Sequence, residues 1–95
     1  MANLTISPAA RQDLSDIFDY IARDKPEAAV NWVESIYQKC QLLATMPESG
    51  ELRPEFGKLV RCCSIGRYVI FFRPLATPGI EIIRVIPGDR DLRTL

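Results

Sequence analysis

The chain has 95 residues, of which 47% are hydrophobic and 25% are charged, so it fits one globular domain over residues 1–95 and not a disordered tail. Twelve Lys and Arg balance twelve Asp and Glu, which excludes recruitment of nucleic acid or a membrane by a strong overall charge, and we expect no sequence-specific DNA binding. Histidine is absent. Imidazole acid–base catalysis, Ser-His or Cys-His nucleophile pairs and His-containing metal sites are therefore excluded.

The cysteines and the N-terminal residues bear on the compartment. Cys40, Cys62 and Cys63 are odd in number and two are adjacent, which is unsuited to a disulfide framework and lacks metal-ligand spacing. The first residues have neither the basic start nor the apolar run of a signal peptide, and no stretch approaches the ~18 apolar residues of a membrane span. We expect a cytoplasmic protein with reduced thiols, without metal or cofactor.

The first half of the chain is acidic and helical in pattern. Residues 1–50 carry four basic and seven acidic side chains, whereas residues 51–95 carry eight and five. Leu4 and Ile6 predict a short strand, and Ser7-Pro8 a helix start, because Ser caps free amides and Pro suits the first turn. An apolar stripe at helical spacing follows, made of Ala10, Leu14, Ile17, Phe18 and Ile21. The carboxylates between them, including Asp13, are predicted to form a solvated face.

A second, longer helix is predicted after a break at residues 23–26. Asp24 and Glu27 have the spacing of a capping box, with Pro26 in the first turn. Its apolar stripe consists of Ala29, Val33, Ile36, Cys40 and Leu43, widened by Trp32, Tyr37 and Ala44. Met46-Pro47 and Gly50 end the helix. The short break makes the two helices an antiparallel hairpin.

After Gly50 the pattern becomes that of strands. Residues 59–64, 68–72 and 80–86 are predicted strands, with a turn over 64–67 and a loop over 74–79. The order is β-α-α-β-β-β. We therefore predict an α+β fold in which the helical hairpin packs on one face of a mainly antiparallel sheet, whose last three strands form a meander.

These strands barely alternate between apolar and polar residues, although a sheet with one wet face should. Two helices cover one face, so the other face needs a tail, a second copy or a different chain, unless loops and the C-terminus suffice. We expect a partner to contact Val69, Phe71 and Ile83 on it. Trp32 is a further candidate anchor, since Trp is enriched at binding hot spots; at helical spacing beside Val33 and Ile36, such a residue more often belongs to the core.

Two blocks carry a family resemblance, GRYVIFFRP over residues 66–74 and IEIIRVIPGDRD over residues 80–91. Together with the helical hairpin and the opening SPAARQDL at residues 7–14, they resemble the RelE/ParE superfamily of toxins from type II toxin–antitoxin modules, and the ParE branch more closely. Neither block is an enzymatic signature, so they identify the superfamily better than the activity.

The resemblance implies a compact toxin in a hetero-oligomer with a cognate ParD-like antitoxin, whose C-terminal segment wraps round it. ParE-type members are taken to poison DNA gyrase, and RelE-type members to cut messenger RNA in the ribosome. We therefore expect a ParE-like toxin that binds gyrase. The alternatives are a RelE-like ribosome-dependent endoribonuclease and a non-toxic interaction module with the same fold.

For the nuclease alternative, the resemblance places Arg61, Arg67 and Arg90 at the basic positions of the relatives. The final Tyr or His of those relatives is missing, and residues 62–64 are Cys-Cys-Ser where they concentrate lysines. We therefore predict no catalytic residue and lean against an enzyme.

The same three arginines are candidates for a target-binding surface, because Arg suits bidentate contacts with carboxylate or phosphate. The alternative is ordinary surface ion pairs with Glu55, Glu81, Asp89 and Asp91. Arg84 lies among apolar residues and is expected to be partly buried and paired. Cys62 and Cys63 are expected on opposite faces of a strand, as packing residues.

Overall fold

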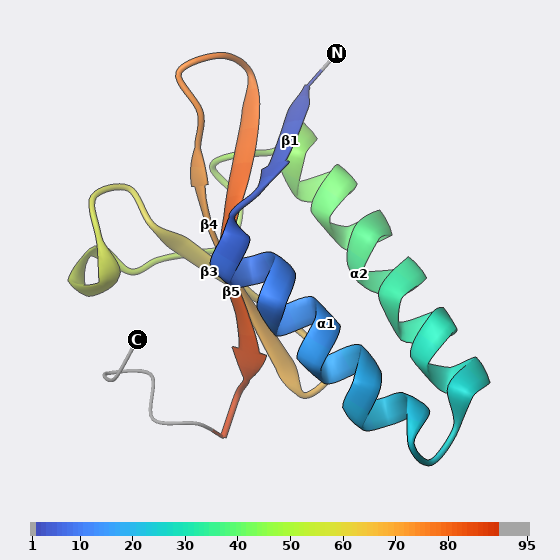
Figure 1. The fold of residues 1–95 in the computed structure, drawn as a ribbon. Helices are drawn as coiled ribbons and strands as arrows, with labels where there is room; N and C mark the ends of the chain where they lie inside the picture. Colours follow the sequence, from blue (N-terminus) through green and yellow to red (C-terminus); the bar gives the residue numbers. More distant parts are fainter. Residues whose placement is uncertain (1, 90–95) are drawn as a thin grey trace.

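The structure, a computed structural model, describes residues 2–89 and has an α+β fold (Figure 1). The elements in chain order are β1 (Asn3–Ile6), α1 (Pro8–Ala22), α2 (Pro26–Thr45), β2 (Glu51–Leu52), the short 3-10 helix η1 (Pro54–Phe56), β3 (Arg61–Ile65), β4 (Tyr68–Pro74) and β5 (Gly79–Pro87). The predicted order β-α-α-β-β-β is confirmed, with β2 and η1 as additions before the meander.

The sheet has the strand order β1-β5-β4-β3-β2. Neighbours β5, β4, β3 and β2 are antiparallel, so the predicted meander is confirmed. The first strand β1 is parallel to the last strand β5, with Leu4 opposite Ile80 and Ile6 opposite Ile82. The first and last strands therefore lie side by side, and the two helices lie on one side of the sheet (Figure 1).

The start of α1 follows the sequence prediction, whereas the start of α2 does not. Ser7 Oγ accepts a hydrogen bond from the Ala10 N–H at 3.0 Å, which caps α1. The capping box predicted for α2 is wrong, because the N-cap is Lys25 and no side chain bonds to the free amides there. Pro26 occupies the first turn, and the Asp24 N–H is used in a turn to the Ile21 carbonyl.

The face of α2 that packs on the sheet is the predicted stripe, with Tyr37 as an exception. Its buried residues are Ala29, Ile36, Cys40, Leu43 and Ala44. Tyr37 is 41% exposed, so its assignment to the stripe is wrong. It follows the buried Ile36 by one residue, about 100° round the helix.

Two apolar clusters lie on the two sides of the sheet. The larger joins both helices to inward side chains of the strands, among them Tyr68, Ile70, Phe72, Ile80, Ile82 and Val85. The smaller one consists of buried Val60, Cys62, Phe71 and Ile86, with partly buried Phe56, Val69 and Ile83. The sheet therefore has an apolar cluster on each face.

The segment over residues 52–60 covers part of the face opposite the helices. The Phe56 ring meets the Phe71 ring edge to face at a centroid distance of 5.2 Å, and the Arg53 guanidinium lies 5.0 Å from the Phe56 centroid. Phe71 and Ile86 are each 1% exposed. The expectation that this face depends on another molecule for cover is therefore wrong at these two residues, because the chain supplies the cover itself.

A β-bulge interrupts the pairing of β4 with β5. Phe71 faces Arg84 while Phe72 faces Ile82, so Ile83 is the extra residue. Since β1 pairs only as far as Ile82, the next backbone groups of β5 have no strand neighbour on that side. The Ser7 hydroxyl donates to the Ile83 carbonyl at 2.8 Å.

Candidate functional site

The structure does not bring the predicted basic residues together. Arg61 begins β3, and its Nη1 donates to the Gly50 carbonyl at 3.3 Å. Arg67 lies in the turn at the far end of the same hairpin and is exposed. The four strand steps from Arg61 to Ile65 alone span about 13 Å. Arg90 lies outside the described residues.

Two of the carboxylates named in the ion-pair alternative, Glu81 and Glu55, pair with other arginines. Glu81 accepts from Arg73 Nη2 at 2.8 Å, and Glu55 accepts from Arg53 Nε at 2.9 Å. Within residues 2–89, Arg61 forms no ion pair, nor does Arg67. Both guanidinium groups therefore lack a carboxylate partner within these residues and could pair with a target. Their role in target binding stays a prediction.

Arg84 is partly buried and paired, as expected, but its partner is Asp13. Arg84 Nε and Nη2 donate to the two carboxylate oxygens at 2.7 and 2.9 Å, and the hydrogen bonds to Asp13 raise the pKa of Arg84. Asp13 also accepts the Val85 N–H at 3.0 Å. Its assignment to a solvated face is therefore wrong. It lies three residues after Ala10 and four before Ile17, a spacing that signals the sheet-facing stripe.

The apolar candidates divide into covered and partly open residues. Val69 and Ile83 are partly buried on the face opposite the helices. Phe71, in contrast, is closed off beneath Phe56, and its role as a partner contact stays a prediction. Trp32 packs edge to face on Tyr68 at 5.1 Å, the core arrangement that its spacing allowed.

The cysteines pack as predicted. Cys62 and Cys63 belong to the clusters on opposite sides of the sheet. Burial raises the pKa of the Cys62 thiol, although Arg53 beside it acts in the other direction. Burial also raises the pKa of Cys40 to about 11. A reactive thiol needs a lowered pKa, so these two do not have that property.

Neither a metal centre nor a membrane segment is found between residues 2 and 89. No group of three or more His, Cys, Asp or Glu side chains there is placed to hold a metal ion. Neither helix described is both long and apolar enough to cross a bilayer.

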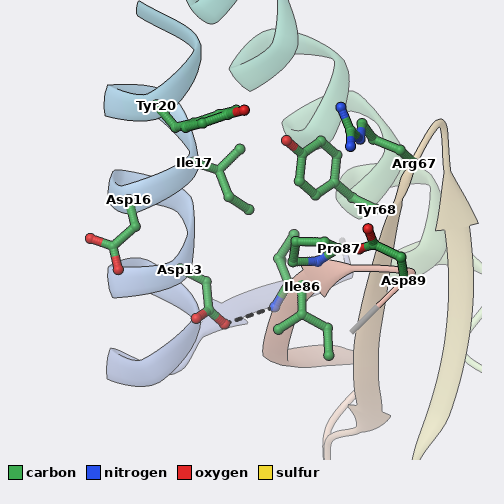
Figure 2. A pocket seen from close by; sticks show the side chains of 10 residues that line it. Asp13, Asp16, Ile17, Tyr20, Arg67, Tyr68, Ile86, Pro87 and Asp89 are labelled. Carbon is green, nitrogen blue, oxygen red and sulfur yellow. Dashed lines mark hydrogen bonds between the residues drawn. The ribbon is translucent and has the colours of Figure 1, made fainter. Parts of the chain in front are cut away.

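Two of the cavities on the described residues lie at opposite ends of the sheet. The first, of about 310 Å³, opens between α1, the β3–β4 turn and the end of β5 (Figure 2). The second, of about 580 Å³, lies beside Arg61 and is lined by Met46, Leu59 and the β4–β5 loop. Sequence reasoning missed the first cavity because its residues come from separate segments, and only the Ala10–Asp13–Ile17 spacing hinted at it.

Comparison with known proteins identifies the family. The model for "ParE toxin of type II toxin-antitoxin system, parDE" matches residues 4–92. The chain belongs to the ParE toxin family. The ParE branch of the RelE/ParE superfamily, suggested by the two sequence blocks, is thereby confirmed, and with it a toxin of a type II toxin–antitoxin system.

Solved structures agree with this ParE assignment. A chain of the chromosomal ParDE toxin–antitoxin system from P. aeruginosa is similar at a TM-score of 0.76 and 25% identity, covering 94% of this chain and 98% of that one. The toxin–antitoxin complex RelBE2 from Mycobacterium tuberculosis gives a TM-score of 0.59 at 18% identity, covering 90% and 96%, and supports the fold alone. No curated protein sequence matches.

Proposed function

We propose that this ParE toxin inhibits growth by binding DNA gyrase, and that a ParD-like antitoxin neutralises it in a hetero-oligomer. The observation that carries the proposal is the family match over residues 4–92, because ParE-type toxins are taken to act on gyrase. The similar chain from a ParDE system supports the antitoxin partner.

The distribution of the basic residues favours binding over cleavage. A nuclease must hold one phosphate with several cations and move one proton. Arg61 and Arg67 stand at opposite ends of a hairpin, and the chain has no histidine. Single cations spread over a surface suit contact with a large macromolecule. We therefore assign Arg61, Arg67 and Arg90 to target binding.

The face opposite the helices supplies the antitoxin site in this proposal. Val69 and Ile83 are partly open there, next to Phe71, which the partly buried Phe56 covers. An amphipathic antitoxin segment would bury these two side chains and order as it binds. Trp32 is left out of this site because it packs on Tyr68.

A supercoiling assay tests the target. Purified toxin is expected to inhibit gyrase in proportion to its concentration, and Arg67→Ala to weaken inhibition by about tenfold if one charged contact is lost. Arg73→Ala is the matched control, since Arg73 is already paired with Glu81. Undisturbed supercoiling together with codon-register cuts in translated messages would establish the nuclease instead.

Growth on induced expression, with and without the ParD-like antitoxin, tests the toxin–antitoxin pair. Arrest is expected only without the antitoxin. Val69→Asp is expected to lower antitoxin affinity by tenfold or more, because it places a charge in an apolar contact. Val30→Asp, on the exposed side of α2, is expected to leave affinity unchanged. Normal growth in both conditions would indicate a non-toxic interaction module.

A further inference from the structure

We propose that the cavity between α1, the β3–β4 turn and the end of β5 binds an arginine side chain of a partner polypeptide. The cavity is open to the surface and holds about 310 Å³, which suits one long side chain better than a helix. Ile17 from α1 and Val85 from β5 are buried, apolar residues of its lining, and the charged side chains of Asp16, Arg67 and Asp89 also line it (Figure 2). Val69 and Ile83 of the proposed antitoxin site do not line this cavity, whereas Arg67, assigned above to gyrase binding, does.

The first observation is the hydroxyl of Tyr68. This residue is 7% exposed, and Figure 2 shows its hydroxyl directed toward Tyr20 and Ile17 across the cavity. Among residues 2–89, no side chain or backbone group forms a hydrogen bond with this hydroxyl. In the same residues, every fully enclosed side-chain oxygen has a hydrogen-bond partner, so the unpartnered Tyr68 oxygen is not fully enclosed. The Tyr68 oxygen therefore opens into the cavity with free capacity to accept a hydrogen bond.

The second observation is the charge of the rim. Asp16 on α1 and Asp89 after β5 are exposed carboxylates on the lining. Asp16 accepts one hydrogen bond at 2.8 Å, from the neutral amide of Gln12. Asp13 also lines the cavity but is already neutralised by Arg84. Among the described lining residues Arg67 is the one cation, so the carboxylates outnumber it and the rim favours a positive group.

Arginine fits these features better than other ligands. Its planar guanidinium offers five donors, enough for a carboxylate on the rim and the Tyr68 oxygen together. Its aliphatic stem can lie on Ile17 and Val85. Tyr20, 67% exposed at the edge, presents a ring face for a cation–π contact. An anion would meet two unneutralised carboxylates here and only one arginine.

The test is an NMR titration of the full chain with N-acetyl-arginine amide, against the citrulline analogue as the neutral isostere. Saturable shifts are expected in the amide signals of Asp16, Tyr20 and Tyr68 with the arginine compound only. Equal shifts with the citrulline compound, or none at the cavity with either, would overturn the proposal.

Variants separate this site from a general acidic surface. Asp16→Asn and Tyr68→Phe are each expected to weaken binding by about five- to tenfold, and Arg67→Gln to strengthen it, because it removes a like charge. Asp19→Asn is the control, since Asp19 is exposed on α1 and does not line the cavity. Equal effects of D16N and D19N would contradict the proposal, with amide-signal dispersion confirming that each variant is folded.

Sedimentation distinguishes the source of the arginine. If the protein forms a dimer that D16N dissociates, the occupant is a second copy of this chain, and a partner of different sequence is overturned.

Discussion

Asp13 joins the first helix to the last strand. Its carboxylate accepts two hydrogen bonds from Arg84 and a third from the Val85 N–H next to the bulge. The two side chains are 13% and 29% exposed. Removing one partner of such a pair leaves the other charge incompletely solvated and a backbone donor unsatisfied. The contribution of Asp13 to stability therefore exceeds that of a surface ion pair.

We expect Asp13→Ala to lower the free energy of unfolding by about 2–3 kcal/mol. Glu81→Ala, which breaks the more exposed pair with Arg73, should lower it by less than about 1 kcal/mol. Urea denaturation of the two variants measures the difference. Equal losses would mean that the Asp13 pair behaves as an ordinary surface contact.

Cys40 makes stability depend on pH in the alkaline range. Above about pH 8.5 the unfolded chain loses this thiol proton, whereas the folded chain keeps it until about pH 11. The unfolded state then binds fewer protons, so stability falls as pH rises across this window, by about 3 kcal/mol in total. Below pH 8.5 this contribution is fully present. Urea unfolding of the protein and of Cys40→Ala from pH 8 to 11 measures it, and identical slopes would contradict it.

At the scale of elements, the helices and the three meander strands are predictable because each is long and strongly patterned. The elements between α2 and β3 are not, since β2 has two residues and η1 three. The residues of β2 and η1 are too few to show a helical or strand periodicity. Their position depends on a contact between residues distant in the sequence, the packing of Phe56 on Phe71. The cover of the second sheet face was missed for this reason.

The pairing of β1 with β5 could not be predicted from the sequence either, because the four residues of β1 do not specify a partner strand. The structure shows what the junction requires. Gly79 has φ +130°, and a Cβ there would collide with the backbone of Asn3. Only glycine fits this approach of two backbones.

Gly79→Ala is therefore expected to detach β1 and to destabilise the protein by about 3 kcal/mol or more, because the strain and the collision add. Gly66→Ala is the matched control. Gly66 also has positive φ, +58°, but open space at its Cβ, so about 1 kcal/mol is expected. Thermal unfolding and hydrogen exchange at Leu4 and Ile6 compare the two, and equal effects would refute the steric argument.

At the scale of the whole molecule, residues 52–60 cover part of the apolar face opposite the helices. Phe56→Ala should uncover Phe71 and raise the fluorescence of a hydrophobic dye several-fold. Leu59→Ala, at a residue already 54% exposed, should not. A wild-type chain that binds the dye as strongly as F56A would show that this cover is ineffective in solution.

The parallel pairing of the first strand with the last has a consequence for synthesis. On the ribosome, β1 and α1 emerge early, yet among residues 2–89 β1 pairs only with β5, the last strand in that part of the chain. The hydrogen bond from Ser7 to Ile83 and the ion pair between Asp13 and Arg84 also need residues of β5. A chain interrupted before Gly79 can form neither, so the N-terminal strand and helix gain these contacts only after β5 has been synthesised.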